Sequence, residues 1–264
     1  MLTRGKTCLL VLVALLFLAG CPQGGGRGAN PAYDKDRHLA ALIEVGQVAI
    51  RTGDFARALV SLGEAEKLAP NNADVKHYIG RTYYLLKNPE KALEYYRVAL
   101  TLDPAKTDVH NNLGIVYLEA KEFELARAEF AYCVADLTYG NANKARYNLG
   151  LLEETMGRPE LAIPYYQDII GSTDLSTSPD AYFRLAYIAY QRGDNRQAVD
   201  YLTVAVRQSP EFAEAFFLLG ESFEKLGFKE DAAEAFGRAV QIDPTSIRGV
   251  EAQKRVRAIM ADYQ

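Results

Sequence analysis

The amino-acid sequence predicts an all-α protein: a superhelical solenoid of six stacked helix–turn–helix repeats, closed by one C-terminal capping helix. The first observation behind this prediction is a small residue that recurs every 34 to 36 positions, where two helices must approach closely. Its members are Gly46, Gly80, Gly114, Gly150, Ala186 and Gly220. A repeat of this length is typical of solenoids, in which each unit packs on its neighbours.

Two further series run in step with the first. Alanine recurs at the same intervals, and a large apolar or aromatic residue stands four positions after each alanine. These alanines are Ala58, Ala92, Ala126, Ala162, Ala198 and Ala232. In four units a proline then ends the second helix, because proline cannot donate a backbone hydrogen bond. The combined pattern, L-G-x-x-Y … A-x-x-x-F … P, resembles the tetratricopeptide repeat (TPR), and the resemblance assigns six repeats to residues 37–246.

Residues 1–20 are predicted to be a targeting segment. Two basic residues, Arg4 and Lys6, precede an apolar run that is shorter than the roughly 20 residues of a membrane-spanning helix. The run ends in Leu18-Ala19-Gly20-Cys21, which resembles the lipobox of bacterial lipoproteins. The resemblance implies cleavage before Cys21 and acylation of that residue. The alternative is an ordinary secretory signal with an incidental cysteine.

Residues 21–36 are predicted to be a lipidated N-terminus followed by a flexible linker, because the segment is rich in glycine and poor in apolar side chains. Several acyl chains on Cys21 give stable membrane anchoring. The next residue is Pro22 and not the aspartate that keeps enteric lipoproteins at the inner membrane. The resemblance therefore implies a lipid-anchored, periplasm-facing protein of the bacterial outer membrane.

Residues 247–264 are predicted to form the capping helix, because a solenoid exposes the apolar face of its last unit. The expected apolar face of this helix consists of Ile247, Val250, Val256, Ile259 and Met260. A membrane-surface helix is the alternative interpretation.

The sequence contains no catalytic or phosphate-binding motif such as HExxH, CxxC or GxSxG. Acidic residues, among them the adjacent Glu153 and Glu154, are expected to solvate helix surfaces. Cys133 is expected to be a buried free thiol. The net charge of −4 is not that of a nucleic-acid-binding protein. We therefore expect no enzyme, no cofactor or metal, and no nucleic-acid or small-molecule substrate.

The predicted functional surface is the groove that first helices line in TPR proteins. Its positions carry many apolar and aromatic residues, which favours a protein partner. The selected residues are Ile50, Arg81, Tyr84, Ile115, Leu118, Tyr147, Leu151, Phe183, Tyr187, Tyr190 and Phe217. The groove lacks the Lys/Asn/Arg set by which chaperone-binding TPR domains hold a C-terminal carboxylate, so an amphipathic helix or an apolar strand is the expected ligand. Alternatively, a flanking segment covers part of the groove.

The whole arrangement resembles the type IV pilus pilotins, which are TPR lipoproteins. The most particular likeness is the irregular join of units three and four, where Asn111-Asn112-Leu113-Gly114, Asp136-Leu137-Thr138-Tyr139 and Asn148-Leu149-Gly150 follow one another. The resemblance implies an escort that binds secretin subunits and promotes their outer-membrane targeting and multimerisation. A general periplasmic adaptor, for cell-wall hydrolases or β-barrel assembly, remains the alternative, and an enzyme or an enzyme's regulatory subunit is the third interpretation.

Overall fold

The computed structural model describes residues 31–261, and this part of the chain consists of thirteen helices without a strand. The all-α solenoid predicted from the sequence is confirmed. In chain order the helices are α1 (Pro31–Arg51), α2 (Phe55–Leu68), α3 (Ala73–Leu85), α4 (Pro89–Leu102), α5 (Thr107–Glu119), α6 (Phe123–Ala135), α7 (Ala142–Thr155), α8 (Pro159–Ile170), α9 (Ser178–Gln191), α10 (Asn195–Gln208), α11 (Ala213–Leu226), α12 (Lys229–Ile242) and α13 (Ile247–Ala261).

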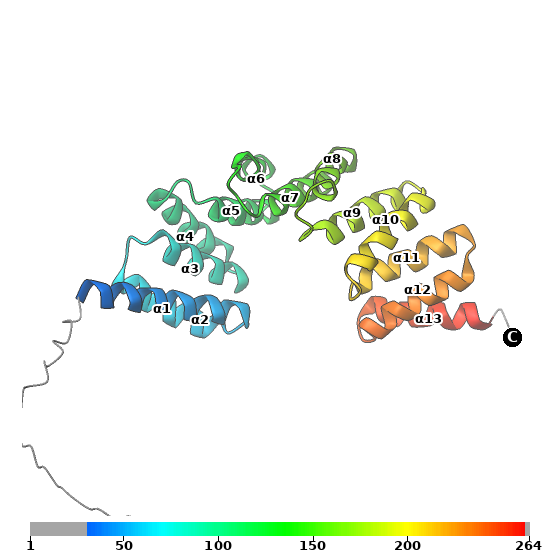
Figure 1. The fold of residues 1–264 in the computed structure, drawn as a ribbon, viewed down its shortest axis with the longest axis horizontal. Helices are drawn as coiled ribbons and strands as arrows, with labels where there is room; N and C mark the ends of the chain where they lie inside the picture. The colour runs from blue at the N-terminus through cyan, green and yellow to red at the C-terminus, as the bar shows by residue number, and fades with distance from the viewer. Residues whose placement is uncertain (1–30, 262–264) are drawn as a thin grey trace, which may run out of the picture.

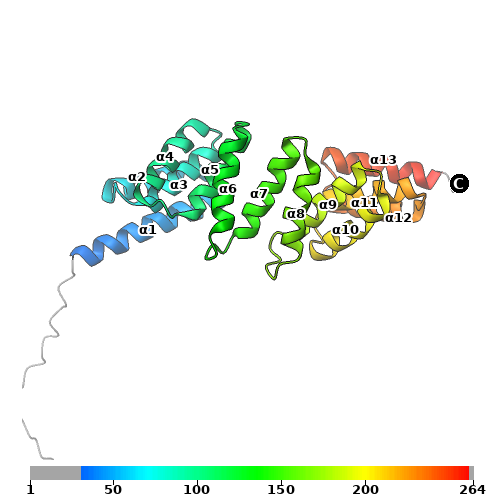
Figure 2. The ribbon, with the colours of Figure 1, turned by 90° about the horizontal axis from the view of Figure 1, so that it is seen from above.

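The helices form six antiparallel pairs, from α1/α2 to α11/α12, which follow one another along an arch (Figure 1). In the middle of the arch, α3, α5, α7 and α9 lie on its inner side and α4, α6, α8 and α10 on its outer side (Figure 1). Seen from above, the pairs lie in a row with α1 at one end and α13 at the other (Figure 2). The repeat order along the chain is therefore also the order in space.

Local signals set where the helices begin. Asn72 and Asn88 each precede a helix and accept a hydrogen bond from the backbone N–H three residues later, at 3.0 and 3.1 Å. Asp54 and Asp194 do the same at α2 and α10. Such caps satisfy backbone donors that have no partner within the first turn. Asp54, Asn88 and Asp194 lie in turns within units and Asn72 lies between two units, so caps mark helix starts in both kinds of connection.

The core explains why a small residue recurs. A Cβ atom added at Gly114 would lie 2.6 Å from the ring of Phe130, and one added at Gly150 would lie 2.5 Å from the ring of Tyr166. Both rings are fully buried. Units two, three, four and six thus pack through an aromatic ring set against a glycine sixteen residues earlier in the same unit, whereas in unit one Leu62 takes the place of the ring. The free thiol of Cys133 lies in this core as expected, and burial raises its pKa to about 12.

The capping helix α13 packs against α12 and α11, but its packed face matches the expected one only in Val256 and Ile259. Gly249, Ala252 and Ile259 are buried, whereas Ile247 is 91% exposed. Val250 and Met260 also face solvent. The reason is a close backbone approach: a Cβ atom at Gly249 would overlap the carbonyl oxygen of Asp243. The packed face of this helix therefore combines small residues near its start with Val256 and Ile259 near its end.

Two predictions concern the N-terminal part of the chain. The helix α1 already begins at Pro31, so its start lies inside the segment 21–36 that the sequence assigned to a linker. The predicted signal segment and Cys21 lie outside the described residues. Within residues 31–261, no helix combines the length and apolar character needed to cross a membrane.

Candidate partner-binding groove

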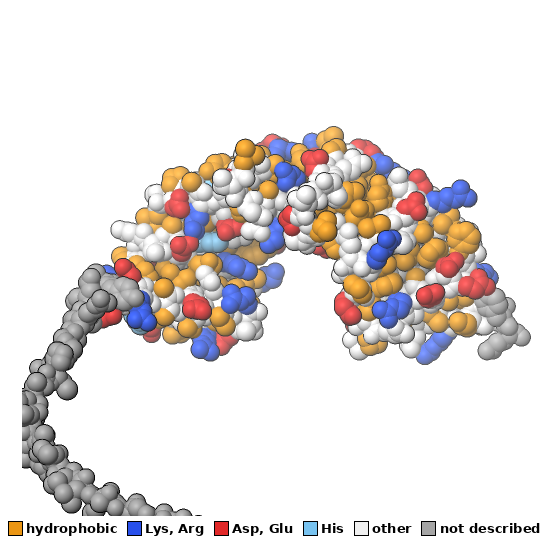
Figure 3. Space-filling view, in the orientation of Figure 1, with side chains coloured by type: hydrophobic (Ala, Val, Ile, Leu, Met, Phe, Trp, Pro, Cys, Tyr) orange, Lys and Arg blue, Asp and Glu red, His pale blue; other side chains and the backbone are white. Residues whose placement is uncertain are grey.

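The inner layer of the arch carries most of the groove residues selected from the sequence. Arg81 is exposed and the following residues are half-buried: Tyr84, Ile115, Leu118, Tyr147, Leu151, Phe183, Tyr187 and Tyr190. Most of these half-buried side chains pack with one edge on the core. Figure 3 shows the hollow beneath the arch, with hydrophobic surface interleaved with charged side chains on both arms. The inner layer thus exposes the edges of aromatic side chains to a partner, while core packing fixes the orientation of these side chains.

Ile50 and Phe217 do not belong to the open surface. They are 5% and 6% exposed, and each belongs to a hydrophobic core cluster. The ring of Phe217 meets that of Phe236 edge-on at 5.5 Å, and the guanidinium of Arg248 lies 5.3 Å from it. Because Arg248 comes from α13, the capping helix covers this position of the last unit. A partner could therefore contact only a small part of either side chain.

Between units four and five, charged and aromatic side chains meet on the inner layer. The guanidinium of Arg184 donates to both carboxylate oxygens of Glu154, at 2.9 and 2.5 Å, and the Tyr166 hydroxyl donates to one of them at 2.5 Å. The same guanidinium lies 5.5 Å from the ring of Tyr187. Beside this pair is a hollow of about 450 Å³, lined in part by Tyr187 and Ile188. The ion pair therefore holds α7 and α9 at a set distance around the hollow.

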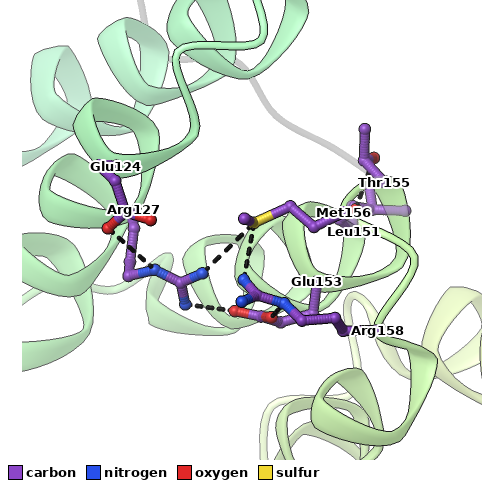
Figure 4. Close-up of polar contacts among 7 residues, drawn as sticks. All are labelled: Glu124, Arg127, Leu151, Glu153, Thr155, Met156 and Arg158. Carbon is purple, nitrogen blue, oxygen red and sulfur yellow. Dashed lines mark hydrogen bonds and ion pairs between the residues drawn. The ribbon is translucent and has the colours of Figure 1, made fainter.

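Glu153 lies on the other side of α7 and is 1% exposed. Its carboxylate pairs with the guanidiniums of Arg127 and Arg158, the latter at 2.9 Å (Figure 4). Both guanidiniums also approach the sulfur of Met156. The expectation that Glu153 and Glu154 solvate the helix surface is wrong, because both carboxylates are enclosed by arginines from neighbouring helices and turns.

A polar hollow of about 290 Å³ lies between the inner helices α3, α5 and α7. It is lined by His77, Tyr78, Arg81, Asp108, Asn111, Asn112, Tyr139, Asn141 and Lys144. The side-chain amide of Asn112 lies 2.7 Å from Nε2 of His77, which is 5% exposed. Among the described residues, no group of three or more potential metal ligands is arranged to hold an ion.

Three stretches of the chain match the model of the tetratricopeptide repeat family: residues 44–107, 111–177 and 183–247. The chain belongs to the tetratricopeptide repeat family. These stretches together cover most of the solenoid, and each spans one pair of neighbouring units.

Relatives of this TPR chain differ in how much of each protein is matched. The type IV pilus assembly protein PilF of Pseudomonas aeruginosa is 27% identical over 231 residues, which cover 86% of this chain and 90% of PilF. Tetratricopeptide repeat protein 37 of Xenopus laevis is 24% identical, and its match covers 80% of this chain but only 14% of that protein. The likeness to PilF thus extends over nearly the full length of both chains.

Solved structures show the same TPR fold. The structure of Pseudomonas aeruginosa PilF superposes with a TM-score of 0.71 at 23% identity, covering 84% of this chain and 99% of that chain. PilW, described as a widely conserved type IV pilus biogenesis factor, also gives a TM-score of 0.71, at 22% identity, covering 81% of this chain and 98% of PilW. At these sequence identities the structural likeness shows the fold alone.

The buried carboxylate of this TPR chain has a signal in the sequence that the groove analysis did not use. Glu153 follows the small residue of its unit by three positions. The corresponding residues of the other units are Ala49, Tyr83, Tyr117, Ala189 and Phe223, all of them apolar or aromatic. A charged residue at a position of the TPR repeat that is otherwise apolar indicates a buried ion pair, because a buried charge needs a partner.

Acidification is expected to destabilise the TPR solenoid through His77. Burial lowers the pKa of its imidazole from 6.5 to about 4. Between these values the unfolded chain binds a proton that the folded chain does not, so stability falls as the pH is lowered. Between pH 7 and pH 5 the loss is about 2 kcal/mol, measurable by urea unfolding at both values. We expect His77→Gln to remove most of this dependence and His38→Gln, at an exposed site, to retain it. An unchanged pH dependence in His77→Gln would contradict the prediction.

Proposed function

We propose that this protein is a pilotin: a non-enzymatic TPR lipoprotein that binds secretin subunits and promotes their outer-membrane targeting and multimerisation in type IV pilus biogenesis. The observation that carries the proposal is the likeness to PilF over nearly the full length of both chains. A repeat pattern alone matches a short piece of a much larger scaffold, as with the Xenopus protein. In this proposal the lipid on Cys21 directs the protein to the outer membrane, and the solenoid binds the secretin subunit.

The groove supports a protein cargo. Aromatic side chains on α9, namely Phe183, Tyr187 and Tyr190, keep one edge accessible while their other edge packs on the core. Such aromatic residues lose little conformational freedom on binding and often dominate protein interfaces. The hollow beside Tyr187 can accept a bulky apolar side chain of the partner.

Secretin assembly in a strain that lacks this gene tests the proposal. We expect the heat- and detergent-resistant secretin multimer to disappear from gels and to return with the wild-type gene. Cys21→Ala is expected to fail to restore the multimer at the outer membrane, because the anchor is lost. If the multimer forms normally without the gene, the pilotin proposal is wrong, and a general periplasmic adaptor takes its place.

Binding of the secretin to the groove is tested with one aromatic variant and a matched control. Tyr187→Ala is expected to weaken binding of the purified secretin at least ten-fold, as measured by surface plasmon resonance, because it removes an inner-layer anchor. Tyr201→Ala removes an equally half-buried tyrosine that packs on the same core cluster, but from the outer helix α10. Equal weakening by the two variants would assign the effect to lost packing and not to the groove.

A further inference from the structure

The polar hollow between α3, α5 and α7 contains hydrogen-bond donors that the fold leaves unused. The guanidinium of Arg81 and the ammonium of Lys144 line the hollow from α3 and α7, and neither forms a hydrogen bond or an ion pair with any residue of the described chain. Both side chains are exposed. The amide oxygen of Asn111 accepts a hydrogen bond from Asn148 at 3.1 Å, which orients its amide and leaves its NH₂ group free toward the hollow.

The other charged groups near the hollow have hydrogen-bond or ion-pair partners. The carboxylate of Asp108 accepts a hydrogen bond from the Tyr139 hydroxyl at 3.0 Å. Lys106 pairs with Asp74 at 2.5 Å, so that pair adds no net charge. The lining of the hollow therefore has two cations against one carboxylate, and Arg81, Lys144 and the Asn111 amide supply its unused donors. An arrangement of this kind suits an anion with several acceptor oxygens.

From this geometry we infer that the hollow binds an acidic side chain of a protein segment that runs through the groove, with Arg81, Lys144 and the Asn111 amide as its donors. Aromatic and apolar groove residues lie one turn further along the same helices: Tyr84 after Arg81, Ile115 after Asn111, and Tyr147 after Lys144. A bound segment therefore meets the polar hollow beside an apolar strip. Helices of three successive units line the hollow, so a segment that runs along the inner layer passes it, and we assign the carboxylate to a side chain of that segment.

The proposed donors differ from the Lys/Asn/Arg set by which chaperone-binding TPR domains hold a C-terminal carboxylate. Arg81, Asn111 and Lys144 come from units two, three and four. The stacking of α3, α5 and α7 brings their side chains to one hollow. The inference holds whether the partner is a secretin or another protein, so its failure leaves the proposed function standing.

The test measures the thermal midpoint of the full chain in non-ionic detergent by circular dichroism, at constant ionic strength. The probe is N-acetylaspartate N-methylamide, and its neutral counterpart is N-acetylasparagine N-methylamide. We expect a saturable rise of about 3 °C with the aspartate probe only. Arg81→Gln and Lys144→Gln are each expected to raise its apparent Kd about ten-fold, since each removes a charged donor. Arg207→Gln, at an exposed site of the outer helix α10, is the matched control and is expected to change nothing.

Four results would overturn the inference. The first is the absence of a saturable shift with the aspartate probe, and the second is an equal shift with the asparagine probe. An equal shift with inorganic phosphate would show that the hollow binds anions without selectivity for a carboxylate. A larger shift with N-acetylalanine, whose carboxylate represents a chain terminus, would exclude the side chain as the source. Because Arg81 and Lys144 are exposed and unpaired, the unliganded variants are expected to keep the wild-type midpoint.

Discussion

Phe130→Ala is expected to lower the free energy of unfolding by about 4 kcal/mol. The ring is fully buried and lies against Gly114, so alanine leaves a cavity between α5 and α6 that the backbone cannot close. Urea unfolding followed by circular dichroism measures the change. Phe228→Ala, at a side chain that is 51% exposed, is the matched control and is expected to cost less than about 1 kcal/mol. A loss of similar size in both variants would contradict this account of the core.

A double-mutant cycle sharpens the first prediction. Gly114→Ala alone is expected to destabilise by about 1–3 kcal/mol, because its methyl group would overlap the Phe130 ring. In the Phe130→Ala background the same methyl group enters the cavity, so its cost is expected to fall close to zero. Additive effects of the two changes would show that the ring and the glycine do not form one packing unit.

Glu153→Ala is the second large expected effect, a loss of about 3 kcal/mol and a fall in Tm of roughly 6–12 °C. The change leaves the guanidiniums of Arg127 and Arg158 facing each other without their shared carboxylate. It also separates α6 from the turn between α7 and α8, which the carboxylate joins (Figure 4).

The control for this network is Glu124→Ala. Glu124 also approaches Arg127, at 3.8 Å, but its side chain is 81% exposed, so the expected cost is below about 0.5 kcal/mol. Glu153→Leu combined with Arg127→Met is expected to recover part of the loss, because apolar residues of similar size replace the buried pair. If Glu153→Ala is no more harmful than Glu124→Ala, the buried ion pair does not stabilise the solenoid.

The sequence by itself determined the repeat and its phase. The contact between Gly114 and Phe130 lies within one unit, as does that between Gly150 and Tyr166, so both partners recur at a constant spacing that the sequence displays. The caps at Asn72 and Asn88 act over three residues and can be recognised in the same way. Local contacts of this kind need no knowledge of how the units stack.

The tertiary structure alone decided which side chains remain accessible. Ile50 and Phe217 occupy groove positions of the repeat, yet packing within the end units and under α13 buries them. The polar hollow joins Arg81 to Lys144, and Glu153 pairs with Arg127 on another unit. These contacts join different units, and the superhelical stacking sets their geometry. Because exposure and pairing depend on the neighbouring units, a position within one repeat does not specify them.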